Sequence, residues 1–360
     1  MKSLESIEFL IPVGVLALCV ILIPLVIKFC QKYSLYDPVN ARKIHSGDIP
    51  RLGGIGIVLS FMVGVIVYGL CFNREDFSRI LPLVISGGII FLFGIIDDLL
   101  ELKAIVKLIV QLVAVSIVVI SGYRFNQILN LQLPVWFSYI LTFGWVLGIV
   151  NAYNLIDGMD GLCGGLSFIS CVTLGLSLIL TGDPAGMVCI ILAASIMGFL
   201  VYNWPPAKIF MGDCGSQFLG FMIAVIPLYS STPDFEYNKF FIMIVIVSIP
   251  MLDTIAAIWR RIRDHRPIMS ADKMHLHHKL MNLGFNKYEA LISLLGVQIL
   301  ICLAIGMSLY ISRSKGTMLL FITYCFVVFM FGAIHYIHRA VLKKHGLYGQ
   351  PVVDPEQLKG

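Results

Sequence analysis

The sequence predicts an all-α polytopic integral membrane protein. Of its 360 residues, 58% are apolar and only 13% are charged. The mean hydropathy is +0.91, which is typical of a chain whose surroundings are mostly lipid. A helix needs roughly 20 apolar residues to cross a bilayer, and the chain offers about eleven such runs. These observations exclude a soluble protein and predict about eleven transmembrane helices.

The predicted spans follow one another along the whole chain, without internal repeats or low-complexity tracts. Their centres lie near Leu16, Val63, Ile89, Ala114, Leu141, Ser170, Ala193, Met222, Val247, Gln298 and Val327. The first span is read as an uncleaved helix, because no small-residue cleavage pattern follows it. The nine cysteines form no Cys-x-x-Cys pair and are interpreted as small core residues. We therefore expect a single membrane-embedded domain over residues 1–360.

Five polar stretches separate these spans, and each one follows an odd-numbered span. They are Asp37 to Gly54, Asp97 to Gln111, Asn151 to Leu162, Asn203 to Ser216 and Arg260 to Phe285. Loops after odd-numbered spans share one side of the membrane. The pattern therefore predicts one shared active site at one membrane face.

The distribution of Lys and Arg predicts the orientation. Most of these residues lie in the odd-numbered loops and near the C-terminus, including Arg260, Arg261 and Arg263. Because cytoplasmic loops carry an excess of Lys and Arg, the N-terminus is expected outside and the polar stretches in the cytoplasm. Residues 337–360 are expected to form a short cytoplasmic tail. The net charge of +5 mostly reflects this topology signal.

Two adjacent carboxylates, Asp97 and Asp98, stand where the third span leaves the membrane. Ionisable groups at this depth are costly and usually functional, although charges that only anchor a helix end are the alternative. Lys103 and Lys107 follow at i, i+4 spacing, which would place two ammonium groups on one helix face. Together these residues are expected to hold a phosphate and a divalent cation.

The third stretch repeats amides and carboxylates at three-residue intervals, in Asn151, Asn154, Asp157 and Asp160. This spacing would put them on one face if the segment were helical. A Ca²⁺ loop is the alternative, but the alternating ligands and terminal Glu of an EF-hand are missing.

In the fourth stretch, glycines flank Asp213 just before a span. The backbone amides of that helix start suit an anion, and Asp213 suits Mg²⁺.

The fifth stretch contains three histidines within four residues, His275, His277 and His278. A Zn²⁺ site is the alternative, but zinc sites normally draw on separated ligands. The neighbouring Arg266 favours another interpretation, in which the imidazoles donate hydrogen bonds to phosphate oxygens. Asp253, within the ninth span, is compatible either with a helix kink or with a role in the site.

These motifs, taken together and in order, resemble the polyprenyl-phosphate N-acetylhexosamine-1-phosphate transferases, glycosyltransferase family 4. The matching pieces are Asp97-Asp98 with its downstream Lys, Asn151-x-x-Asn154-x-x-Asp157-Gly-x-Asp160-Gly-Leu, Phe210-Met-Gly-Asp213-x-Gly-Ser and His275-x-His277-His278. The family includes the muramoyl-pentapeptide transferase and the enzymes that initiate O-antigen (lipopolysaccharide) and teichoic-acid synthesis. The histidine pattern followed by Leu280 and Gly284-Phe285 looks like the N-acetylglucosamine branch.

The resemblance implies a transferase that moves N-acetylglucosamine 1-phosphate, or a related acetamido sugar phosphate, from a UDP-sugar to undecaprenyl phosphate. It further implies release of UMP, a bacterial plasma membrane location and an active site on the cytoplasmic face. Nucleic acid is not an expected partner, and a homodimer is compatible with the resemblance.

Residue roles are carried over by the same resemblance. Mg²⁺, or Mn²⁺ in its place, would be held by Asp213 and secondarily by Asn154. Asp97 and Asp98 would orient or deprotonate the lipid phosphate, while Asp157 and Asp160 would contact nucleoside and sugar. The predicted catalytic residues are therefore Asp97, Asp98, Asp157, Asp160 and His277, and the predicted substrate-binding residues are Lys43, Lys107, Asn151, Asn203, Lys208, Phe210, Arg266, His275 and His278.

Three other functions are weighed against this one. A phospho-N-acetylmuramoyl-pentapeptide transferase would share the same motifs. A polytopic transporter or lipid flippase would place polar residues at the bilayer midplane and show symmetry between halves, whereas here the polar residues gather at one interface. A CDP-alcohol phosphotransferase would need an Asp-Gly segment leading into Ala-Arg, which Asp157 to Asp160 does not supply.

Overall fold

The computed structural model describes residues 8–36, 49–72, 74–230, 232–267 and 274–344. Within these ranges the chain is almost entirely helical, which confirms the all-α prediction. The helices are α1 (Leu10–Lys32), α2 (Gly54–Cys71), α3 (Arg74–Leu100), α4 (Ala104–Ile120), α5 (Val135–Ile156), α6 (Leu162–Leu180), α7 (Ala185–Asn203), α8 (Asp213–Tyr229), α9 (Pro233–Ile246), α10 (Ser248–Arg263), α11 (Leu276–Asn282), α12 (Lys287–Tyr310) and α13 (Arg313–Lys344). A short hairpin, β1 (Gln127–Ile128) with β2 (Leu131–Gln132), joins α4 to α5.

Eight of the described helices are long and apolar enough to cross a membrane, and α9 with α10 is a pair bent by 58° that makes a ninth span if the two helices cross together. The two shorter apolar helices, α4 and α8, have 17 residues each. Together these elements lie at the positions of the predicted spans, although α4 and α8 are shorter than a full span. Every predicted centre falls inside one of them, except Val247, which lies at the break between α9 and α10. The side of the membrane that each loop faces stays a prediction.

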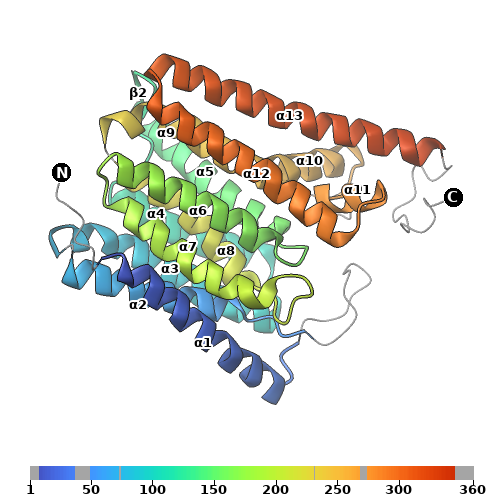
Figure 1. Cartoon of the computed structure of the whole chain (residues 1–360), viewed down its shortest axis with the longest axis horizontal. Helices are drawn as coiled ribbons and strands as arrows, with labels where there is room; N and C mark the ends of the chain where they lie inside the picture. Colours follow the sequence, from blue (N-terminus) through green and yellow to red (C-terminus); the bar gives the residue numbers. More distant parts are fainter. Residues whose placement is uncertain (1–7, 37–48, 73, 231, 268–273, 345–360) are drawn as a thin grey trace.

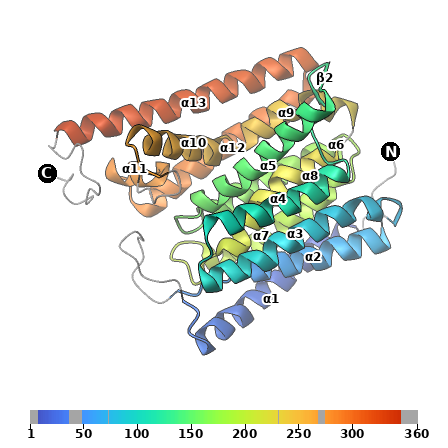
Figure 2. The ribbon, with the colours of Figure 1, turned by 180° about the vertical axis from the view of Figure 1, so that it is seen from behind.

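The helices form a bundle with α8 at its centre (Figures 1 and 2). Every residue of α8 from Cys214 to Leu228 is buried. By contrast, α1 and α13 lie at opposite sides of the bundle in Figure 1, and only 22% and 11% of their apolar windows are buried. These outer helices present apolar side chains to lipid, as expected for a chain whose solvent is a bilayer.

Glycines allow three neighbouring helices to contact α8 through their backbones. A Cβ on Gly54 of α2 would lie 2.4 Å from the backbone nitrogen of Gly215. A Cβ on Gly94 of α3 would lie 2.4 Å from the Cα of Cys214. On the other side, Gly220 of α8 leaves no space for a Cβ against α5. Small residues permit such close approach of membrane helices, and here they fix the start of α8.

The break between α9 and α10 has a local cause in Pro250. The carbonyl of Ile246 would normally accept a hydrogen bond from the backbone N–H four residues later, but proline has none. Gln298 of α12 supplies the missing donor, with Nε2 2.9 Å from the Ile246 oxygen and 3.0 Å from Ser170 Oγ. A side chain from a neighbouring helix thus satisfies the freed carbonyl, as required in a lipid environment.

The end of the chain differs in part from the expected tail. Helix α13 continues to Lys344, so residues 337–344 extend the last helix. His338 is buried there, and its Nε2 lies 3.1 Å from Asn282 Nδ2 at the end of α11. Packing against α11 therefore keeps this segment helical, and residues 345–360 lie outside the described part of the chain.

Candidate active site

Asp98 caps the first turn of α8. Its Oδ1 accepts a hydrogen bond from the backbone N–H of Asp213 at 2.8 Å, and its Oδ2 accepts one from Cys214 at 3.0 Å. The first N–H groups of a helix have no partners within the helix and favour a negative charge. The sequence led us to expect a bound anion at this position. That expectation needs correction, because the anion that satisfies these two amides is the carboxylate of Asp98.

Gly212 makes the contact between Asp98 and α8 sterically feasible. Its φ is +74°, in the left-handed region that favours glycine. A Cβ at this position would lie 2.2 Å from the Arg51 carbonyl and 2.6 Å from Asp98 Oδ2. A larger residue would therefore push Asp98 and the start of α8 apart.

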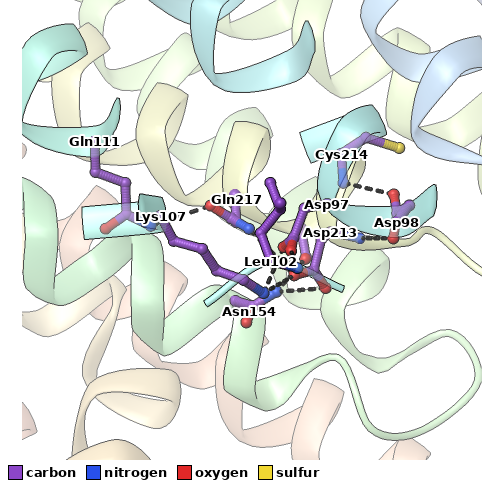
Figure 3. A network of polar contacts seen from close by, with 10 residues as sticks. Asp97, Asp98, Leu102, Lys107, Gln111, Asn154, Asp213, Cys214 and Gln217 are labelled. Atoms are coloured by element: carbon purple, nitrogen blue, oxygen red, sulfur yellow. Dashed lines mark hydrogen bonds and ion pairs between the residues drawn. The ribbon is translucent and has the colours of Figure 1, made fainter. Parts of the chain in front are cut away.

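Asp213, the first residue of α8, receives donors from three helices (Figure 3). Lys107 Nζ of α4 lies 2.9 Å from its Oδ2, and Asn154 Nδ2 of α5 lies 3.0 Å from its Oδ1. Gln217, one turn later in α8, donates to Oδ2 at 3.2 Å. The side chain of Asp213 nevertheless stays 31% exposed, so its carboxylate remains accessible to a ligand.

Asp97 lies beside Asp213, and the ammonium group of Lys107 contacts both carboxylates. Lys107 Nζ forms an ion pair with Asp97 Oδ2 as well as with Asp213. Asp97 Oδ1 accepts a hydrogen bond from the backbone N–H of Leu102 at 2.9 Å, and its side chain is only 1% exposed. With Asp98 included, three carboxyl groups lie close to the single ammonium group of Lys107. The formal charge of the centre is therefore negative, which favours a further cation.

Lys103 does not take part in this cluster as the sequence analysis expected. Helix α3 ends at Leu100, and Glu101 turns the chain with a φ of +50° before α4 begins at Ala104. Lys103 therefore precedes α4 and is exposed, whereas Lys107 lies within the helix and reaches the carboxylates.

The Asn-Asp stretch is helical only in its first part. Asn151 and Asn154 lie in the last turns of α5, Asp157 is its C-cap, and the remaining residues form a turn before α6. Asp160 Oδ2 accepts a hydrogen bond from the backbone N–H of Ala207 at 3.1 Å. Asn203 Oδ1 accepts one from Gly161 at 3.0 Å, and its Nδ2 donates to the Ile209 carbonyl at 2.8 Å. Asn203 and Asp160 thus tie the third polar stretch to the fourth.

The histidines lie over this turn. A Cβ on Gly158 would lie 3.0 Å from His277 Cε1, so the imidazole packs directly on the glycine beside Asp157. His277 is fully buried, and neither ring nitrogen has a hydrogen-bond partner among the described residues. Burial, with a smaller contribution from His278, lowers the pKa of His277 well below its ordinary value. The imidazole is therefore neutral at neutral pH.

Asp253 holds the histidine segment in place. Its Oδ2 lies 2.8 Å from His275 Nδ1, and its Oδ1 accepts a hydrogen bond from the backbone N–H of Leu276 at 2.8 Å. Asp253 is 2% exposed. A carboxylate that accepts from one ring nitrogen fixes the orientation of the imidazole. Of the two roles that the sequence left open, these contacts favour a role at the site.

The polar stretches are joined to one another through these contacts and one more. The Gly53 N–H donates to the Phe210 carbonyl at 2.9 Å, and the Phe210 N–H donates to the Pro50 carbonyl at 2.8 Å. The first stretch therefore pairs with the fourth, the fourth with the second and third, and the third with the fifth. The convergence that the loop pattern predicted is present in the described part of the chain.

Several predicted site residues stand apart from the carboxylate cluster. Lys208 and Arg266 are exposed, and His278 is half-buried, with its ring 4.1 Å from that of His277. Lys43 lies outside the described residues. Asn151 donates to Gln111 Oε1 at 3.0 Å and to the Leu147 carbonyl at 2.7 Å.

Sequence reasoning did not single out Gln111 or Gln217, although both contact the cluster or its partners. Gln111 Nε2 donates to Gln217 Oε1 at 3.0 Å. The signal available was the presence of a glutamine within an otherwise apolar span, since such residues are costly in lipid.

The donor set fits a magnesium ion better than a transition metal. Among the described residues, no group of three or more His, Cys, Asp and Glu side chains is placed so that it could hold a metal ion by itself. Mg²⁺ is usually held by one or two carboxylates and completed by water and substrate phosphates. The partly exposed Asp213, with Asp97 beside it, offers that kind of incomplete oxygen site, whereas Asn154 turns its NH₂ group and not its oxygen toward Asp213.

Comparison with known proteins identifies related chains. The model of glycosyl transferase family 4 matches residues 80–231. A protein of Bacillus subtilis (strain 168) named probable undecaprenyl-phosphate N-acetylglucosaminyl 1-phosphate transferase is 34% identical, over 86% of each chain. An Escherichia coli (strain K12) protein named undecaprenyl-phosphate alpha-N-acetylglucosaminyl 1-phosphate transferase is 27% identical, over 85% of this chain and 84% of the relative. A Mycobacterium leprae (strain TN) protein named decaprenyl-phosphate N-acetylglucosaminephosphotransferase is 32% identical, over 68% and 69%.

Proposed function

Because the chain belongs to glycosyl transferase family 4, in the branch of polyprenyl-phosphate N-acetylglucosamine-1-phosphate transferases, we propose that it uses UDP-N-acetylglucosamine and undecaprenyl phosphate. The products are the lipid-linked sugar diphosphate and UMP. The protein would act in the bacterial plasma membrane, with its site at the cytoplasmic face, and would begin the synthesis of a cell-envelope glycan.

The proposed reaction is a phosphoryl transfer. A phosphate oxygen of the lipid forms a bond to the β-phosphorus of the donor. The bond from that phosphorus to the oxygen bridging the α- and β-phosphates breaks, and UMP leaves with the electron pair. The protein has mainly to position the two phosphates and neutralise charge. Mg²⁺ supplies this neutralisation when it is bound to the donor diphosphate.

The observation that carries the proposal is the arrangement around Asp213. Its carboxylate is held by donors from α4, α5 and α8 and remains accessible, with Asp97 and Lys107 in contact with it. We assign Asp213 to Mg²⁺, with Asn154 as a second ligand whose amide would have to turn its oxygen toward the ion, because its NH₂ group donates to Asp213 here. Lys107 is assigned to the phosphates, which its ammonium group can bind as a point charge. Asp97 orients Lys107 and the lipid phosphate.

Asp98 is assigned a positioning role, since both of its oxygens are used to cap α8. The nucleoside and sugar are assigned to the turn that contains Asp157 and Asp160 and to Phe210, which lies in the segment paired with the first loop. The buried, neutral His277 covers that turn. It is suited to donate one hydrogen bond to a phosphate oxygen and to accept one from a sugar hydroxyl.

The experiment uses purified full-length protein in detergent with Mg²⁺, undecaprenyl phosphate and a panel of labelled donors. The panel contains UDP-N-acetylglucosamine, UDP-N-acetylgalactosamine and UDP-N-acetylmuramoyl-pentapeptide. We expect UMP release and labelled lipid with the first donor. Product only from the muramoyl-pentapeptide donor would establish the alternative transferase. No UMP with any donor, together with lipid movement across vesicles, would favour the flippase instead.

A further inference from the structure

Two glutamines are buried inside apolar helices beside the carboxylate cluster. Gln111 of α4 and Gln217 of α8 are each 3% exposed. An amide removed from water costs free energy unless its polar groups are paired. Here the amides pair in series: Asn151 Nδ2 donates to Gln111 Oε1 at 3.0 Å, Gln111 Nε2 to Gln217 Oε1 at 3.0 Å, and Gln217 Nε2 to Asp213 Oδ2 at 3.2 Å (Figure 3).

The direction of this amide chain is determined at both of its ends. The ionised carboxylate of Asp213 can only accept hydrogen bonds, so Gln217 must turn its NH₂ group toward Asp213 and its oxygen toward Gln111. At the other end, the NH₂ group of Asn151 also donates to the Leu147 carbonyl, which can only accept. Each amide between these acceptors therefore has one orientation, and the hydrogen bonds from Asn151 to Gln111, from Gln111 to Gln217 and from Gln217 to Asp213 are all donated in the direction of Asp213.

We propose that Gln217, oriented in turn by Gln111 and Asn151, is a positioning residue that sets the orientation of the Asp213 carboxylate for the cation. This inference rests on the proposed function, in which Asp213 is a magnesium ligand. Gln217 lies one helical turn after Asp213, on the same face of α8. Together with Asn154 on Oδ1 and Lys107 on Oδ2, it restrains rotation of the carboxylate and leaves one lone pair of Oδ1 without a donor from these three residues.

The amide chain also places partial positive charge toward Asp213. Hydrogen bonds in series polarise one another, and the effect is stronger in a low-dielectric interior. Loss of Gln111 should therefore affect Asp213 only through Gln217. If the glutamines served only to hold α4, α5 and α8 together, their removal would change stability and leave the affinity for a cation unaltered.

Gln298 provides a matched control within the same chain. It is a buried glutamine in a membrane-spanning helix, 1% exposed, and its Nε2 bonds Ser170 and the Ile246 carbonyl instead of the carboxylate cluster. Replacement of Gln298 by Met removes a buried amide of the same size. If the loss of any buried amide destabilised the protein enough to weaken cation binding, this variant would also bind the cation more weakly.

The test measures Mn²⁺ binding by the full-length protein in detergent, from the electron paramagnetic resonance signal of free Mn²⁺. The variants are Gln217→Met, Gln111→Met, the double variant and Gln298→Met. We expect Gln217→Met to weaken binding about tenfold, as is usual for partners of a metal ligand. Gln111→Met should weaken binding less, the double variant should match Gln217→Met, and Gln298→Met should bind as the wild type does.

Two failures can be told apart. Asp213→Asn is included as the reference for loss of the ligand itself. If the wild type binds Mn²⁺ no better than Asp213→Asn, the metal assignment is refuted together with this inference. If Asp213→Asn is weakened while Gln217→Met binds normally, only the positioning role is refuted. An additive effect in the double variant, or an equal loss in Gln298→Met, would also overturn it.

Discussion

The carboxylate of Asp98 accepts a hydrogen bond from the backbone N–H of Asp213 at 2.8 Å, although 115 positions separate the two residues in the chain. The same carboxylate accepts from Cys214. The end of α3 thereby fixes the start of α8, and the assignment of Asp98 to positioning leads to the first prediction.

Asp98→Asn should lower both stability and turnover. An asparagine has one acceptor oxygen instead of two, so one backbone N–H of α8 would lose its partner and face an NH₂ group. An unsatisfied buried donor costs about 1–3 kcal/mol. We expect a lower unfolding temperature in detergent and a kcat reduced by orders of magnitude. Asp264→Asn, at an exposed aspartate that pairs with Arg263, is the control. A normal kcat in Asp98→Asn would contradict the cap assignment.

Asp213→Ala should abolish turnover while the protein remains folded. The side chain is partly exposed, and its removal leaves Asp98 and the backbone of α8 in contact. UMP release should be undetectable, whereas the elution volume in size-exclusion chromatography should match the wild type. Substantial activity in this variant would refute the assignment of Asp213 to the cation.

Asp97→Asn should also lower kcat strongly, because it removes one of the two carboxylates that hold Lys107.

Asp253→Asn should impair catalysis through the histidine segment. The substitution removes the charge that orients His275 and weakens the attachment of Leu276. We expect a higher KM for the UDP-sugar and a lower kcat, with the KM for the lipid phosphate unchanged. Steady-state kinetics with each substrate varied in turn would show this difference. An equal rise in both KM values would indicate general disruption instead.

Gln298→Leu should destabilise the protein, by about 1 kcal/mol as is usual for a hydrogen bond between membrane helices. The cause is the Ile246 carbonyl, which would lose its donor. In a Pro250→Ala background, residue 250 regains an N–H, so the same substitution should cost less. The free energy of unfolding in detergent, measured for Gln298→Leu, Pro250→Ala and the double variant, would give this coupling. If the two single losses of stability simply added in the double variant, the explanation would be wrong.

The depressed pKa of His277 predicts how stability depends on pH. The folded state holds this imidazole neutral, whereas in the unfolded chain it binds a proton below about pH 6.5. The unfolded state therefore binds more protons at low pH. This contribution to stability is fully present above the unfolded pKa and is lost as the pH falls below it. His277→Gln should show a smaller loss of unfolding temperature than the wild type between about pH 7.5 and pH 5.5.

The span positions and the convergence of the polar stretches could be predicted from the sequence, because both follow from hydrophobic length and loop order. The different tasks of Asp97 and Asp98 could not. Adjacent residues on a helix point about 100° apart, so one reaches Lys107 and the other reaches α8 only because of where those elements pack.

Other parts of the site also depend on tertiary packing. Asn203 looks like a substrate ligand in the motif, yet its amide bonds the backbone of Gly161 and Ile209. Gln217 follows Asp213 by one helical turn within an apolar run, but its partner Gln111 lies on another helix. Pro250 was visible in the sequence, but the residue that satisfies the carbonyl it frees could be found only from the structure.

The glycine contacts at Gly54 and Gly94 have a consequence for how the protein can move. Where backbone meets backbone, no side chain can rotate to create slack, so the wall of the site formed by α2, α3 and α8 is rigid. Closure over a bound donor would then involve the side of α11, which is held by the carboxylate of Asp253 at its start and by His338 at its end.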